Sequence, residues 1–176
     1  MTYAAKKFTE AGVLRILGID PGYAIVGYGI LEYDGFRFRP VTFGAITTEA
    51  GDEFVRRLKV IYDDMTTLLG MYSPDAVSIE KLFSNTNVKT VINVAQARGV
   101  ILLAAENAGV PVYEYTPLQV KQSVVGYGRA EKPQVMEMTR NILGLKKTPK
   151  PDDTADALAL AICHGHNKTG IEISGR

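Results

Sequence analysis

The stretch Val13-Leu-Arg-Ile-Leu-Gly-Ile-Asp-Pro-Gly22 sets the fold that we expect for this chain. Its first seven residues are mostly apolar, which predicts a buried strand over 13–19. Asp20-Pro21-Gly22 is a turn signal, so this strand ends at a carboxylate. The dipeptide Asp34-Gly35 is a strong hairpin signal between two further strands, predicted at 25–33 and 36–47. The sequence therefore predicts three consecutive antiparallel strands.

The rest of the chain alternates between helix and strand patterns. Five apolar residues at spacings of three and four predict an amphipathic helix: Phe54, Leu58, Ile61, Met65 and Leu68. The further predicted elements are a strand at 76–79, a helix at 88–108 closed by Gly109, a strand at 110–115, and helices that begin at Thr116-Pro117, Pro133 and Pro151-Asp152. This order predicts an α/β or α+β domain with helices on the faces of a mixed five-stranded sheet, in which three antiparallel strands precede two parallel ones.

Length and composition are those of one ordinary globular domain. The chain has 176 residues, of which 46% are hydrophobic and 22% charged. We expect a single domain over 13–168, a loose extension at 1–12 and a short tail at 169–176. The apolar runs fall far short of the roughly 20 residues that cross a bilayer, and 1–12 does not resemble a signal peptide. The single cysteine, Cys163, is expected to be a buried thiol, and it excludes an internal disulfide, which suits a reducing compartment. We therefore expect a cytoplasmic protein with no membrane span.

Charge is distributed unevenly along the chain, although the net charge is only +1. Residues 31–80 hold nine acidic and five basic side chains, whereas 118–150 hold seven basic and two acidic ones. Such segregation fits a basic face that meets a polyanion, and it equally fits solvated helix faces. Under the first interpretation, Arg129 in the basic segment is a candidate DNA-binding residue.

Four carboxylates occupy positions that suggest a metal site. Asp20 and Glu80 end the first and fourth predicted strands, and Asp153 and Asp156 lie three residues apart on the last helix. Strand ends meet at a crevice in this class of fold. Mg²⁺ and Mn²⁺ prefer oxygen ligands, and two such ions roughly 4 Å apart support phosphoryl displacement. Spacing alone leaves simpler roles open, since Asp20 suits a turn and Asp152 and Asp153 suit a helix start; we assign only Asp152 to capping.

The two histidines end the last helix and are expected to be solvated. His164 lies eleven residues beyond Asp153, roughly 16 Å along the helix axis, which is too far to share a metal ion with it. We therefore expect no catalytic role for His164 or His166.

Six segments, in order between about residues 14 and 168, resemble the RuvC family of crossover-junction endodeoxyribonucleases, which resolve Holliday junctions. They are Leu-Gly-Ile-Asp-Pro-Gly (17–22), Ser-Ile-Glu-Lys-Leu-Phe (78–83), Gln-Ala-Arg-Gly-Val (96–100), Val-Lys-Gln-Ser-Val-Val-Gly-Tyr-Gly (120–128), Ala-Glu-Lys-Pro-Gln-Val (130–135) and Asp-Thr-Ala-Asp-Ala-Leu-Ala (153–159). Taken together, these segments are far more specific than any one of them alone.

This resemblance implies a ribonuclease-H-like fold and a homodimer that nicks two strands of like polarity in a four-way DNA junction, in recombination and repair. It implies Mg²⁺ or Mn²⁺ as cofactor, with two ions per active site, and the RuvA and RuvB branch-migration complex as partner. The residues it carries over are Asp20, Glu80, Asp153 and Asp156 as metal-binding catalytic acids, Lys121 and Lys132 as basic residues near the scissile DNA, and Phe83 as an aromatic that stacks on a junction base.

Three alternatives remain to be compared with this interpretation. An actin-like ATPase or sugar kinase has a similar phosphate-binding hairpin, but it needs two such domains and 176 residues supply one. A related ribonuclease-H-like nuclease acting on RNA would share the carboxylates but not segments 78–83 and 120–135. A junction-binding scaffold without activity would not need the intact carboxylate set.

Overall fold

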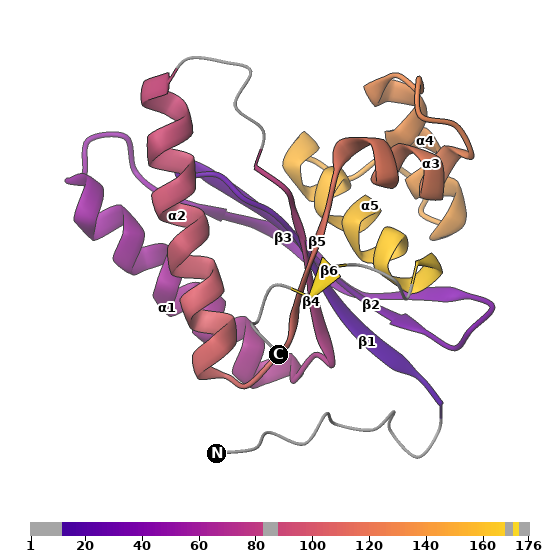
Figure 1. Ribbon diagram of the computed structural model, residues 1–176, viewed down its shortest axis with the longest axis horizontal. Helices are drawn as coiled ribbons and strands as arrows, with labels where there is room; N and C mark the ends of the chain where they lie inside the picture. Colours follow the sequence, from indigo (N-terminus) through magenta and orange to yellow (C-terminus); the bar gives the residue numbers. More distant parts are fainter. Residues whose placement is uncertain (1–11, 83–87, 168–170, 173–176) are drawn as a thin grey trace.

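The computed structural model describes residues 12–82, 88–167 and 171–172. In chain order, its elements are β1 (Leu14–Asp20), β2 (Ile25–Tyr33), β3 (Phe38–Thr47), α1 (Phe54–Tyr72), β4 (Ala76–Glu80), α2 (Val88–Asn107), β5 (Val112–Tyr115), α3 (Pro117–Val125), α4 (Lys132–Ile142), α5 (Asp152–His166) and β6 (Ile171–Glu172). The sheet lies between two layers of helices, with α1 and α2 on one face and α5, covered by α3 and α4, on the other (Figure 1). Within these residues, no helix combines the length and the apolarity that a membrane span requires.

The sheet has the strand order β3-β2-β1-β4-β5-β6. β1, β2 and β3 pair antiparallel, while β4 runs parallel to β1 and β5 parallel to β4. These five strands form the mixed sheet that the sequence predicts. A sixth strand of two residues, β6, pairs antiparallel with β5 inside the segment expected to be a tail.

Local sequence signals act where they were expected. The Asp34 carboxylate accepts hydrogen bonds from the backbone N–H groups of Phe36 and Arg37 at 2.9 and 2.8 Å, which closes the hairpin between β2 and β3. Gly109 follows α2 with a φ of +68°, a left-handed conformation that suits glycine. Thr116 caps α3: its Oγ1 accepts a hydrogen bond from the N–H of Gln119 at 3.2 Å.

The two-residue period of the strands decides which side chains face each helical layer. Leu17 and Ile19 of β1 pack into the core beneath α1 and α2, whereas Ile16 packs into the core beneath α5. In β4, the Ser78 hydroxyl donates a hydrogen bond to the Leu160 carbonyl of α5 at 2.7 Å. The same alternation places the last residues of β1 and β4, both of them acidic, on the α5 side of the sheet.

Glycines let α5 approach the sheet at backbone distance. A Cβ atom on Gly18 of β1 would lie 2.0 Å from the Ala157 carbonyl oxygen, and one on Gly27 of β2 would lie 2.0 Å from the Asp153 carbonyl oxygen. The Thr154 hydroxyl also donates to the Gly44 carbonyl of β3 at 3.0 Å. The first turn of α5 is therefore fixed directly on the strands.

Candidate active site

Asp20 and Glu80 end neighbouring parallel strands at the same level. β1 and β4 pair Gly18 with Ser78 and Ile19 with Ile79, and each acidic residue comes next in its strand. Because neighbouring strands lie roughly 4.8 Å apart, side chains at one level of one face are adjacent. The two predicted strand-end carboxylates therefore meet at the edge of the sheet where strands β1 and β4 end.

α5 brings two more carboxylates to this edge. The Asp153 backbone packs on Gly27, which is the residue paired with Asp20 across β1 and β2. Burial raises the pKa of Asp20 to about 8, and the charges of Glu80, Asp156 and Asp153 add to this effect, in that order. Burial, followed by the charge of Asp156, also raises the pKa of Glu80. The structure thus brings together all four carboxylates that the sequence singled out.

Lys132, the first residue of α4, contacts this cluster. Its Nζ lies 2.7 Å from Asp156 Oδ2 and 4.0 Å from Asp152 Oδ2. The hydrogen bond with Asp156 is the main reason that the pKa of Lys132 lies above its usual value. The same ammonium charge partly offsets the upward pKa shifts of Asp20 and Glu80. Lys132 therefore serves as a counter-charge for the carboxylates.

The other predicted DNA-binding residues stand apart from the carboxylates. Lys121 is half-buried on α3, and Arg129 is exposed in the loop between α3 and α4. Among the described residues, the ion pair to the four carboxylates is that of Lys132 with Asp156, and neither Lys121 nor Arg129 forms one with them. Phe83 lies outside the described residues.

An ion pair that the sequence analysis did not identify supports the end of β4. The Arg98 guanidinium of α2 pairs with the Glu114 carboxylate of β5, and both side chains are about 15% exposed or less. Arg98 Nε also donates to the carbonyl oxygen of Glu80 at 3.4 Å. The signal for this pair was an isolated arginine in an apolar helix that has no acidic residue in its first turns.

The expectation that His164 is solvated is wrong. Its side chain is buried, and its Nδ1 lies 2.7 Å from the Tyr115 hydroxyl. Burial lowers the pKa of His164 to about 4. His166, two residues later, is exposed as expected, and Cys163 is buried as expected.

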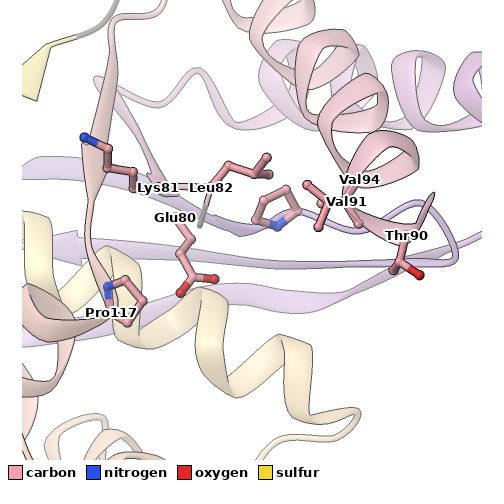
Figure 2. Close-up of a pocket in the computed structure, with 8 residues that line it drawn as sticks. Glu80, Lys81, Leu82, Thr90, Val91, Val94 and Pro117 are labelled. Atoms are coloured by element: carbon pink, nitrogen blue, oxygen red, sulfur yellow. The ribbon is translucent and has the colours of Figure 1, made fainter. Parts of the chain in front are cut away.

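A pocket of about 220 Å³ adjoins the carboxylates. Figure 2 shows Leu82, two residues after the end of β4, pointing toward Val91 and Val94 of α2, while the Glu80 carboxylate points the other way, toward α5. Glu80 therefore borders both the pocket and the carboxylate cluster.

The donor set of the cluster suits a hard divalent cation. Within the described part of the chain, no three acidic, histidine or cysteine side chains already stand in a metal-binding arrangement. Lys132 holds one oxygen of Asp156, so a cation must displace this ammonium to use it. A cluster whose mutual repulsion helps to raise the pKa of Asp20 to about 8 would be stabilised by such an ion. Oxygen ligands of this kind are those that Mg²⁺ and Mn²⁺ prefer.

Comparison with known proteins identifies the family. A model described as "Crossover junction endodeoxyribonuclease RuvC" matches residues 16–164. The chain belongs to the RuvC family. A RuvC of this name from Brevibacillus brevis is 60% identical over 161 residues, which are 92% of this chain and 97% of the relative.

Solved RuvC structures share the fold. The Thermus thermophilus RuvC structure is 35% identical, with a TM-score of 0.85, and the match covers 91% of this chain and all of that one. T. thermophilus RuvC in complex with a Holliday junction substrate has a TM-score of 0.87 at the same identity, over 91% of this chain and 99% of the other. The domain is thus a ribonuclease-H-like nuclease fold, and RuvC membership speaks against the ATPase and RNA-nuclease alternatives.

Proposed function

We propose that this chain resolves Holliday junctions by paired, symmetrical nicks in two DNA strands of like polarity. The observation that carries the proposal is the convergence of Asp20, Glu80, Asp153 and Asp156, from two strands and one helix, at one edge of the sheet. A buried group of like charges is unfavourable unless it binds a cation, either alone or together with a DNA phosphate. Its RuvC relatives carry the name of a crossover junction endodeoxyribonuclease.

The four carboxylates would hold Mg²⁺ or Mn²⁺, with two ions in each active site. Such ions activate a water molecule and neutralise charge on the phosphate during in-line displacement. The chain itself fixes the ligands: glycines in β1 and β2 let α5 pack closely on these strands, and Arg98 donates a hydrogen bond to the Glu80 carbonyl. The Lys132 ammonium would leave Asp156 and form an ion pair with a phosphate oxygen of the DNA strand.

The basic segment supplies the DNA contacts in this proposal. α3, α4 and their connecting loop lie on the α5 side of the sheet, and they hold Lys121, Arg129 and Lys132 (Figure 1). We assign Lys121 and Arg129 to the phosphate backbone near the cut, and Phe83 to stacking on a junction base.

Two identical cuts require two active sites, which a two-fold homodimer supplies. We assign the dimer contact to the outer face of α2, because Ile92 and Leu103 are about half exposed there, while Ala97, Ile101 and Ala104 of the same helix are buried. The proposal includes RuvA and RuvB as partners in branch migration and a cytoplasmic location.

A binding competition tests the substrate class. A labelled four-way junction is bound without divalent ions, and unlabelled junction or linear duplex of equal length is added. The junction should compete at least tenfold better, because a duplex cannot contact both halves of a dimer. Affinity should fall steeply with salt, since phosphate contacts release counterions. Equal competition by junction and duplex at moderate salt would overturn the proposal.

A further inference from the structure

The pocket beside Glu80 has no part in the proposed chemistry, yet it opens directly next to the reacting groups. Its volume is about 220 Å³, which is below the roughly 300–1,000 Å³ of pockets that enclose drug-sized ligands. It therefore fits a group about as large as one planar ring system rather than a whole nucleotide.

The walls of the pocket are mostly apolar. Leu82 faces Val91 and Val94 across it, and Pro21 and Pro117 line it from the turn after β1 and the start of α3. These side chains can contact the two faces of a planar ring. They offer few hydrogen-bonding groups that would distinguish one base from another. Such a lining suits a nucleobase held by its faces.

The position of Glu80 links this pocket to the site of cutting. Glu80 borders the pocket and belongs to the carboxylate cluster, so a phosphate at the cluster puts an adjoining base within reach of the pocket. Nucleotides at a branch point are only partly stacked, and taking one base out of a stack costs a few kcal/mol at most.

Charge around the rim favours the backbone of the same nucleotide. The first turn of α2, which includes Thr90, has no acidic residue. Lys81 also borders the pocket, but its Nζ points away from Leu82 (Figure 2) and lies 3.9 Å from Glu114 Oε2. The positive end of the α2 dipole attracts phosphate.

We propose that this pocket receives one nucleobase, unstacked from a nucleotide that adjoins the phosphate to be cut. The inference rests on the proposed junction cleavage and adds to it a base-binding site on α2 and β4. Val94 and Leu82 would then help to decide which phosphate of the junction lies at the carboxylates.

The test combines filling the pocket with removing the base. Val94→Phe fills the pocket, and Val55→Phe, on an α1 side chain that is 75% exposed, is the matched control. Junctions carry an abasic nucleotide on either side of the cut, and their Kd values are measured without divalent ions. The parent and Val55→Phe should lose about tenfold in affinity at one of the two positions, as expected for one base contact. Val94→Phe should bind the intact junction more weakly and lose nothing further at that position.

A second measurement does not depend on how Val94→Phe folds. With 2-aminopurine at the sensitive position, fluorescence should rise when the parent binds, because the base leaves its stack. Unchanged fluorescence, or the same affinity for intact and abasic junctions at both positions, would overturn the base pocket. In that case the parent would still prefer junctions to duplex and nick them, whereas failure of the proposed function would abolish that preference as well.

Discussion

Lys132 and Asp156 form an ion pair that we expect to break when a metal ion binds Asp156 and a DNA phosphate binds Lys132. Their Nζ and Oδ2 atoms are 2.7 Å apart, and the lysine side chain is 53% exposed. Such a half-exposed pair is screened by water, so it stabilises the fold by about 1 kcal/mol or less. Its importance lies in the carboxylate oxygen that it occupies.

Lys132→Ala should therefore raise the affinity of the metal-free protein for Mn²⁺ by up to about fivefold, since the competing ion pair is worth about 1 kcal/mol or less. Junction nicking should fall, because the charge that would neutralise the phosphate is lost. Calorimetric titration of Mn²⁺ without DNA measures the first effect. Lys121→Ala removes a lysine from α3 outside this pair and should leave Mn²⁺ affinity unchanged. Equal Mn²⁺ affinity of Lys132→Ala and the parent would show that the ion pair does not compete with the cation for Asp156.

His164 makes a distinct contribution to the pH dependence of stability. Burial lowers its pKa to about 4, from an ordinary value of 6.5. As the pH falls below 6.5, His164 is protonated in the unfolded chain but stays neutral in the folded chain. The unfolding free energy therefore declines until about pH 4, by up to about 3 kcal/mol. Denaturant unfolding across this range should show a shallower decline for His164→Gln. His166→Gln, at the exposed end of α5, should follow the parent; a His164→Gln curve parallel to the parent's would contradict the assignment.

Among the elements, the close packing of α5 on the glycines of β1 and β2 keeps the four carboxylates near one another. Gly18→Ala would place a Cβ 2.0 Å from the Ala157 carbonyl oxygen and 2.8 Å from the Ala161 nitrogen, both backbone atoms. α5 must then move away from β1 and carry Asp153 and Asp156 from Asp20. We expect a loss of about 2–3 kcal/mol in unfolding free energy and a loss of nicking.

Gly70→Ala on α1 is the matched control for this substitution. Gly70 is exposed, and an added Cβ there meets nothing within 4 Å. Alanine in a helix interior should stabilise the protein by about 0.5–1 kcal/mol. Thermal unfolding of both variants separates the effects, and unchanged stability and nicking in Gly18→Ala would show that α5 is not held as described.

The elements themselves followed from the sequence because their signals are local. The hairpin at Asp34-Gly35, the cap at Thr116 and the end of α2 at Gly109 each depend on neighbouring residues, and the structure confirms them. The period of two also accounts for Asp20 and Glu80 sharing a face. Contacts between distant segments could not be predicted in this way: the Lys132–Asp156 pair, the support of Glu80 by Arg98 and the burial of His164 all depend on how helices pack. β6 was missed because two residues show no periodicity.

At the scale of the whole molecule, the two helical layers have different tasks in this account. We propose that the α5 side presents carboxylates and basic residues to DNA, and that the α2 side presents the half-exposed apolar residues Ile92 and Leu103 to a second copy. Charging this surface by Ile92→Asp with Leu103→Asp should give a folded monomer by light scattering. Val55→Asp, on a still more exposed residue of α1, should remain a dimer. A parent that is monomeric, or a double variant that stays dimeric, would refute the assignment of α2.

We propose that the carboxylate cluster of each protomer cuts one strand, so that a four-way junction is cut at two symmetrical positions. Denaturing gels that map both nicks on one labelled junction in Mg²⁺, for the parent and Asp20→Asn, test it most directly. The substitution keeps the shape of a side chain in the cluster and removes its charge, so the barrier should rise by several kcal/mol while junction binding survives. We expect paired nicks in two strands of like polarity for the parent and none for Asp20→Asn on the same time scale. Nicking by Asp20→Asn at the parent's rate, or parent nicks without two-fold symmetry, would contradict it.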